Sequence, residues 1–264
     1  MMKHLFAILY AIAAFAVTPA SAATVIYIDS YRFGEPASPP PGGDPYFANV
    51  TYLVTNEGSN GSTPSPAVVG GTINYTDSAA LSTASAPTGQ SSSLYLDATG
   101  ARDSIWLNSG AGSQLTGDFT VEIWFAINNS GNVNNARLFD IGANKLSVFL
   151  NGYVETNPTI SIYAAAGYII NAYALSTWTL GTWHSVCVSR SGSTVYLFFD
   201  GVLQTTATNS ATLGATINGM SIGSYFKAAG NHLADSYIGP FRLTNGVCRY
   251  TATYTVPTLP LPES

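Results

Sequence analysis

Charged side chains are scarce in this chain. Of its 264 residues, Lys and Arg number 9 and Asp and Glu 14, or 9% of the whole. Typical domains carry about 25% charged residues, so Ser, Thr, Asn and Gly must cover much of the surface here. Nucleic acids and anionic membranes are bound by clustered Lys and Arg. The few basic residues and the formal net charge of −5 therefore disfavour both kinds of partner.

Histidine and cysteine are also rare, with three and two residues respectively. Zinc is held by three or four His, Cys or acidic ligands at local spacings, and none of the usual spacings occurs. Neither His184 nor His232 has the flanking motif that accompanies an activated serine. His184 directly follows Trp183, and we expect it to pack in the interior. The sequence thus argues against zinc-dependent and serine-nucleophile chemistry.

No apolar run reaches the roughly 18 residues that a transmembrane helix needs. The run Leu5–Val17 follows Lys3 and precedes Ala20-Ser21-Ala22. A basic residue, a short apolar run and small residues in this order are typical of a cleaved secretory signal. We therefore expect residues 1–22 to be removed, the mature protein to be secreted or periplasmic, and no membrane association to remain.

Two further segments precede the main domain. Residues 23–33 contain the strand-like run Thr24–Phe33, which forms either a short edge strand or a docking peptide. Residues 34–45 are rich in proline and glycine, and proline is rejected from the interior of helices and sheets. We interpret residues 34–45 as a linker and residues 46–264 as one domain, a length that a single β-sandwich can use.

Strand patterns dominate this domain, most clearly in Thr182–Thr206. Trp183–Ser189 and Thr194–Phe199 are rich in β-branched and aromatic residues, and Ser191-Gly192-Ser193 supplies a tight turn between them. Asp200-Gly201 predicts a second hairpin turn, of two residues. Because side chains alternate between the two faces of a strand, five residues should point into the core: Val186, Val188, Val195, Leu197 and Phe199.

The run Phe119–Ile127 alternates as regularly. Phe119, Val121, Ile123, Phe125 and Ile127 share one face, and Thr120, Glu122 and Trp124 share the other. Shorter runs of this kind are Ser91–Ala98, Ser104–Leu107, Arg137–Ile141, Leu146–Leu150 and Thr159–Tyr163. No window after the signal shows sustained helical periodicity. The predicted class is all-β, a two-sheet antiparallel β-sandwich of about a dozen strands.

Several of these motifs together resemble the laminin-G-like, concanavalin A-like lectin/glucanase jelly roll family. They are Ser92–Asp97, Asp118–Trp124, Trp183–Leu203 and Phe241–Tyr250, and the resemblance spans roughly Asp44 to Pro262. The last run continues as Tyr-Thr-x-x-Tyr-Thr-x-Pro, which resembles the version of the domain found in bacteriophage virion and prophage proteins. Members are mostly recognition or adhesion modules, commonly for carbohydrate. The resemblance implies binding rather than catalysis.

Glycoside hydrolysis is the enzymatic alternative, because the same family includes glucanases. Their active strand presents several carboxylates on one face, whereas here Glu122 is followed by Trp124 and Ala126. Asp118 lies about 13 Å from Glu122 along a strand, beyond the roughly 5–9.5 Å that glycosidase carboxylates span. We therefore expect Glu122 to pair with an arginine or to face solvent, and Glu122→Gln to cost under about 1 kcal/mol.

Laminin-G-like domains often carry one calcium ion at the rim of the sandwich, and the resemblance leaves this open for the present chain. Calcium takes six to eight oxygen ligands, usually with at least one carboxylate. The candidates are Asp140, Asp235 and the loop Asn128–Asn135. None of them forms a specific motif, so the metal ligands are not assigned, and no other cofactor is expected.

A sugar site needs an aromatic platform with amides and hydroxyls around it. The stretch Tyr163–Trp178 interrupts the strand pattern and holds our candidate ligand-binding residues, which are Tyr168, Asn171, Tyr173 and Trp178. We expect at least one of its aromatic residues to be substantially exposed.

The two cysteines, Cys187 and Cys248, leave two alternatives open. An exported chain meets the oxidant that disulfide formation needs. Free cysteine is nevertheless among the most buried residue types, and a bridge requires Cα atoms within about 7 Å. The pair is either bridged or separate and buried.

The leading functional hypothesis is a secreted, non-catalytic module that binds glycan or another cell-surface polymer. The alternative is a phage virion or tail-associated structural protein that uses the sandwich as an interaction scaffold, with other virion or tail proteins as its partners. A glycoside hydrolase ranks third.

Overall fold

The structure is a computed structural model. It describes residues 43–63, 69, 73–76, 78–97, 104–108, 114–128, 132–142, 144–153, 158–164, 167–175, 177–213, 219–225 and 232–264, which all belong to the compact unit Pro36–Ser264. The predicted signal, the segment 23–33 and most of the predicted linker lie outside the described residues. Among the described residues, no helix is long and apolar enough to cross a membrane.

The described elements are one short 3-10 helix and a series of strands. The helix η1 (Phe47–Asn49) is followed by β1 (Val50–Val54), β2 (Ile73–Thr76), β3 (Ala80–Ser82), β4 (Ser93–Leu96), β5 (Ser104–Asn108), β6 (Phe119–Ile127), β7 (Asn132–Ile141), β8 (Leu146–Tyr153), β9 (Thr159–Ala164), β10 (Gly167–Ala174), β11 (His184–Ser191), β12 (Thr194–Phe199), β13 (Val202–Thr208), β14 (Gly219–Ile222) and β15 (Ser236–Asn245). The predicted all-β class is confirmed.

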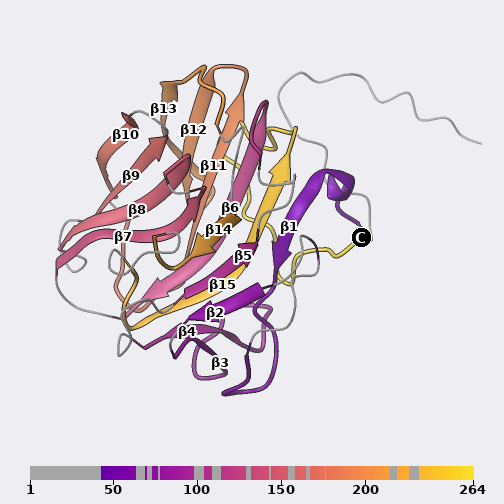
Figure 1. Cartoon of the computed structure of the whole chain (residues 1–264), viewed down its shortest axis with the longest axis vertical. Helices are drawn as coiled ribbons and strands as arrows, with labels where there is room; N and C mark the ends of the chain where they lie inside the picture. Colours follow the sequence, from indigo (N-terminus) through magenta and orange to yellow (C-terminus); the bar gives the residue numbers. More distant parts are fainter. Residues whose placement is uncertain are drawn as a thin grey trace, which may run out of the picture. The chain divides into compact units, whose positions relative to one another are not determined.

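The strands form two antiparallel sheets (Figure 1). Sheet 1 has the order β13-β12-β11-β6-β15-β4-β3, with β1 also pairing with β15. Sheet 2 has the order β10-β9-β8-β7-β14-β5-β2. Strand β6 lies at the centre of sheet 1 because it pairs with β11 on one side and with β15 on the other.

The main core fills the space between the two sheets. The alternating apolar residues of β6, from Phe119 to Ile127, are all buried in it. The five residues predicted to be core in β11 and β12 are also at most 1% exposed. Their alternation confirms the face assignment made from the sequence.

The two predicted turns of the β11–β13 meander also form. Asp200 and Gly201 have φ values of 48° and 76°, as a two-residue hairpin turn requires. Gly192, between β11 and β12, has a φ of 57°. The β12–β13 turn places Asp200 beside the start of β11, since Val186 of β11 pairs with Phe199 at the end of β12.

The outer face of sheet 1 is covered as well, by the chain after β15. All nine residues of β6 are buried, including Thr120, Glu122 and Trp124, which point away from the main core. A second apolar cluster forms there from Val50, Leu53, Trp124 and Leu261, with Val256 and Leu259 packed against it. The last residues of the chain thus act as an irregular third layer on part of this sheet.

A buried ion network lies under this layer. Arg242 donates to Glu122 Oε2 over 2.6 Å and to Asp44 Oδ2 over 3.0 Å. Arg249 donates to both oxygens of Asp44 over 2.8 and 2.7 Å. Glu122 therefore pairs with an arginine, as one of the two alternatives predicted. It is only 1% exposed, however, so the expectation that its charge is cheap to remove does not fit this environment.

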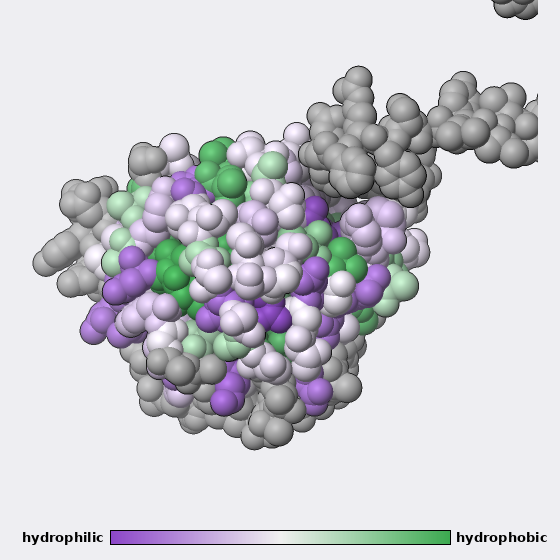
Figure 2. All heavy atoms as spheres, turned by 90° about the horizontal axis from the view of Figure 1, so that it is seen from above, coloured by the Kyte–Doolittle hydropathy of each residue, from purple (hydrophilic) through white to green (hydrophobic). Residues whose placement is uncertain are grey.

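The surface agrees with the scarcity of charge. Figure 2 shows one face, on which weakly polar residues predominate and strongly hydrophilic ones are scattered. Among the described residues only two large hydrophobic side chains are exposed, Tyr168 at 52% and Val202 at 50%.

Candidate functional site

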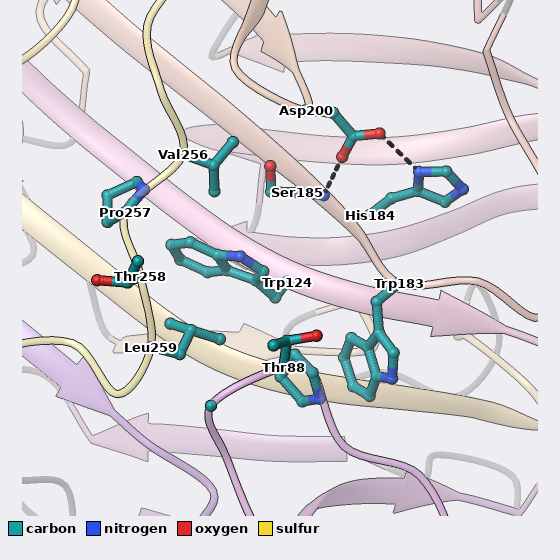
Figure 3. A pocket seen from close by; sticks show the side chains of 12 residues that line it. Thr88, Trp124, Trp183, His184, Ser185, Asp200, Val256, Pro257, Thr258 and Leu259 are labelled. Carbon is teal, nitrogen blue, oxygen red and sulfur yellow. Dashed lines mark hydrogen bonds and ion pairs between the residues drawn. The ribbon is translucent and has the colours of Figure 1, made fainter.

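A pocket of about 440 Å³ lies on the outer face of sheet 1 (Figure 3). Its walls come from four places: the loop before β4, the central strand β6, the β11 start with the β12–β13 turn, and the C-terminal segment. The lining residues are Pro87, Thr88, Gly89, Trp124, Trp183, His184, Ser185, Asp200, Val256, Pro257, Thr258 and Leu259. This volume falls within the range of small-molecule sites, which is roughly 300–1,000 Å³.

Two indole side chains form its apolar part. Trp124 points outward from β6 and lies between the C-terminal segment and Trp183 in Figure 3. Trp183 is half-buried just before β11, and its Nε1 donates to Ser85 Oγ over 3.0 Å. Gly239 makes this arrangement possible, since a Cβ there would lie 3.0 Å from Trp124 Cβ and 3.2 Å from the Trp183 ring.

The polar part consists of Asp200 and Ser185. Asp200 Oδ1 accepts the Ser185 N–H over 2.7 Å, and its Oδ2 lies 2.8 Å from His184 Nδ1. The Asp200 side chain is nevertheless 40% exposed, so its remaining lone pairs are open to a ligand. Ser185 is 5% exposed, and its Oγ has no hydrogen-bond partner among the described residues. A buried hydroxyl without a protein partner calls for another group to satisfy it, such as a water or a polar atom of a bound molecule.

His184 supports the site but is not arranged as a catalytic base. Its ring stacks on Trp178 at 5.0 Å and on Phe199 at 4.8 Å, so the predicted packing role is confirmed. Its Nε2 accepts the Thr179 N–H over 3.2 Å and lies 2.9 Å from Thr182 Oγ1. Both ring nitrogens are thus engaged, and neither of them bonds to Ser185 Oγ. A serine triad needs that contact.

The C-terminal segment is held against the pocket by two glycines. Gly201 and Gly89 have positive φ values, and a Cβ on either one would overlap a backbone oxygen, that of Tyr254 or Leu259 respectively. Tyr254 N–H also donates to Gly201 O over 2.9 Å. This close approach brings Val256–Leu259 alongside Trp124.

The ligand-binding residues predicted from the sequence lie elsewhere, on β10 and just after it. The stretch expected to interrupt the strand pattern is for the most part a strand, at the edge of sheet 2. Tyr168 is 52% exposed, which confirms that one aromatic of this stretch is at the surface. Asn171 is exposed as well.

The other two predicted residues, Tyr173 and Trp178, pack against the main core. Tyr173 is half-buried, and its hydroxyl donates to Gln204 O over 2.9 Å. Trp178 packs against the main core, 5.6 Å from the Phe125 ring centre. Neither lines the pocket. The structure therefore does not gather the four residues into one platform.

The predicted calcium ligands are engaged with protein groups. Asp140 Oδ1 accepts from Ser147 Oγ over 2.6 Å and from the Asn144 N–H over 2.8 Å. Asp235 accepts from the Tyr95 hydroxyl over 3.0 Å, and burial together with this bond raises the pKa of Tyr95 to about 12. The part of the chain that is described contains no cluster of three or more His, Cys, Asp or Glu suited to a metal. The loop Asn128–Asn135 lies partly outside that part, so the calcium alternative stays untested.

Both cysteines are free thiols in the structure. Cys187 is fully buried, and burial followed by the nearby charge of Glu122 raises the pKa of its thiol well above the usual range. Cys248 is half-buried, and its thiol donates to Tyr250 O over 3.3 Å. Of the two alternatives, the structure has the separate thiols.

The comparisons with known proteins identify the family. Residues 99–248, more than half of the chain, match the Laminin_G_3 family, described as the concanavalin A-like lectin/glucanases superfamily. The chain therefore belongs to this family, as its motifs indicated. No curated protein matches the sequence.

Solved structures share the fold at low identity. Domain 4 of AbnA, an extracellular arabinanase from Geobacillus stearothermophilus solved with arabinotriose, has a TM-score of 0.52 and 15% identity, covering 76% of this chain and 94% of that one. Trypanosoma rangeli sialidase in complex with sialic acid gives 0.53 and 15%, covering 75% and 31%. The botulinum neurotoxin serotype D binding domain gives 0.54 and 12%, covering 78% and 51%. The likeness concerns the fold, and the chain spans only part of the latter two.

Proposed function

We propose that this protein is a non-catalytic recognition module that binds carbohydrate in the pocket between Trp124, Trp183 and Asp200. The observation that carries the proposal is the joint presence, in one pocket, of two indoles, an exposed carboxylate and the unpaired hydroxyl of Ser185. Sugars offer C–H faces that stack on aromatic rings, and hydroxyl groups that bond to carboxylates and serines. The half-buried Trp183 offers the apolar contact and the exposed Asp200 the polar one, while Trp124, at 6% exposure, is a mostly covered part of the lining.

The distribution of carboxylates supports a role without catalysis. Glycosidases place two carboxyl groups about 5–9.5 Å apart across the bond they cleave. Asp200 is the one acidic side chain among the residues that line the pocket. Glu122, on the strand where glucanases carry their acids, is buried in its pair with Arg242. The hydrolase hypothesis therefore has less support than binding.

The comparisons support the same reading at the level of fold. A domain of this architecture, domain 4 of the arabinanase, was solved with a bound trisaccharide. The secretory signal expected from the sequence would bring this chain to glycans or other polymers outside the cell.

A second candidate is an interaction scaffold, which the phage-like C-terminal motif would place in a virion or tail. The exposed Tyr168 on β10 favours it, because β10 is an edge strand of sheet 2 and an edge can pair with another chain. This role would use sheet 2 rather than the pocket.

A glycan array separates the two candidates. We expect the mature protein to bind a defined subset of glycans, and Trp183→Ala to lose that binding because it removes one of the two indoles. Tyr168→Ala is the matched control, since it removes an aromatic side chain of sheet 2 outside the pocket. Thermal unfolding of each variant shows whether it is folded. Loss of binding in Tyr168→Ala but not in Trp183→Ala would move the site to β10.

A further inference from the structure

The pocket is lined by one acid and one titratable base, Asp200 and His184, which bond to each other. Of its twelve lining residues, Asp200 is the only acid, and none is Lys or Arg. We infer that the pocket selects among sugars by charge: it accepts neutral and amine-bearing units and rejects units that carry a carboxylate or a sulfate. This inference rests on the proposed function and adds the class of glycan to it.

The carboxylate is positioned to meet a ligand. Each of its oxygens already holds one hydrogen bond, from Ser185 N–H and from His184, and a carboxylate has about four acceptor positions. These two contacts fix the group at the β12–β13 turn while its side chain stays 40% exposed. Two neighbouring sugar hydroxyls, or one ammonium group, can therefore donate to the free lone pairs.

The arginines of sheet 1 are committed elsewhere. Arg242 and Arg249 are bound by Glu122 and Asp44 beneath the C-terminal segment. Arg190 donates to the backbone oxygens of Gly117 and Ala211. None of these groups lines the pocket. No guanidinium or ammonium group of the lining therefore faces Asp200, and a second carboxylate brought beside it would be repelled while the His184 imidazole is neutral.

Ser185 favours a ligand that brings a polar group into the deep part of the pocket. Its Oγ is buried and without a partner among the described residues, so a ligand that fills the pocket with only apolar atoms leaves it unsatisfied. A hydroxyl or amine of the sugar would meet this group and Asp200 together. The combination suits a polyhydroxylated or amino sugar better than a lipid or an apolar peptide.

The test uses a glycan array that carries one backbone in neutral, amine-bearing and acidic form, such as trimers of glucose, glucosamine and glucuronate with the same linkage. At about pH 8, where an ordinary histidine is neutral, and at low salt, we expect the acidic form of this backbone to bind at least about tenfold more weakly than the neutral form. Asp200→Asn should reduce this discrimination, because it removes the charge from a position with positive φ that asparagine also tolerates.

A second variant tests the charge without touching Asp200. Thr88 is exposed at the rim, and Thr88→Lys should raise binding of the acidic forms. Its control is Thr208→Lys, also exposed and about 20 Å along β13 from Val202. Acidic forms that bind the unaltered protein as well as neutral forms do, or discrimination that survives in both pocket variants, would overturn the inference. An array on which no glycan binds at all would instead contradict the proposed function.

Discussion

At the scale of single residues, the ion pair of Glu122 with Arg242 decides the role of the one acid on β6. The sequence allowed it to be an exposed acid, a paired acid or part of a catalytic set. The structure buries it at 1% exposure with Arg242 at 2%, and Arg242 is shared with Asp44. Burial acts to lower the pKa of Arg242, but the charge of Glu122 outweighs it and the pKa is raised. The Arg242 guanidinium therefore stays charged in a place with little access to water, where Glu122 and Asp44 are its ion-pair partners.

We predict that Glu122→Gln costs about 3 kcal/mol of unfolding free energy, in place of the small cost expected from the sequence, because it leaves a buried guanidinium short of its counter-charge. Phe199→Ala should cost about 3–5 kcal/mol through the cavity it leaves in the core. Urea unfolding measures both. Glu263→Gln is the control, since Glu263 is exposed and should cost no more than about 0.5 kcal/mol. Equal, small costs at 122 and 263 would show that the ion network does not form.

Asp44 gives the protein an acid-sensitive element. Burial alone would raise its pKa, but the hydrogen bonds from Arg249 and Tyr46 and the charges of Arg249 and Arg242 together lower it below the usual 3.8. A carboxyl group with a lowered pKa in the folded state stabilises that state above about pH 4, and this contribution is lost as the pH falls toward the lowered value. Asp44→Asn should therefore unfold more easily at pH 7 and lose less stability between pH 5 and pH 3 than the unaltered protein. Urea midpoints across this range test the effect, and parallel pH profiles for the two proteins would refute it.

At the scale of elements, the C-terminal segment covers part of the outer face of sheet 1, and the strand patterns did not predict this cover. It has no periodicity of its own, yet Tyr250 and Tyr254 stack at 3.6 Å between ring centres on the outer face of sheet 1. Phe198 meets the Tyr254 ring at 5.3 Å. The segment buries Cys187 and the ion network and then forms one wall of the pocket. The Tyr-Thr-x-x-Tyr-Thr-x-Pro run that marked the family resemblance thus has a structural purpose in this chain.

We predict that Cys187 does not react with thiol reagents in the folded protein, because it is buried and its pKa is raised. Removal of residues 252–264 should uncover it and increase its rate of modification by at least about tenfold. Cys248→Ser in both backgrounds leaves Cys187 as the thiol that is counted. In denatured, unreduced protein the unaltered chain should give two thiols. A count of zero there would mean that the cysteines are bridged.

At the scale of the whole molecule, the sequence was enough to predict the fold but not the pocket. Regular alternation in Phe119–Ile127 and the Asp200-Gly201 turn act over a few residues, so they indicated the strands and faces correctly. The pocket joins Thr88, Trp124, Asp200 and Thr258, which only the tertiary fold brings together. The outward position of Trp124 on β6 was the one signal available, and it was interpreted only as a missing acid. The residues near Tyr168 were predicted as a ligand site because their stretch departs from the strand pattern, and binding at them stays a prediction.

The most direct test of the central claim follows the indole resonances of the protein during titration with a glycan that the array identifies. The chain has four tryptophans, which single Trp→Phe variants assign. Trp124 and Trp183 line the pocket, Trp178 packs against the main core, and Trp106 is in β5 of sheet 2. We predict that the Nε1–H signals of Trp124 and Trp183 shift with a common dissociation constant while that of Trp106 stays in place. Saturable binding that leaves both Trp124 and Trp183 unshifted would contradict the assignment of the pocket as the carbohydrate site.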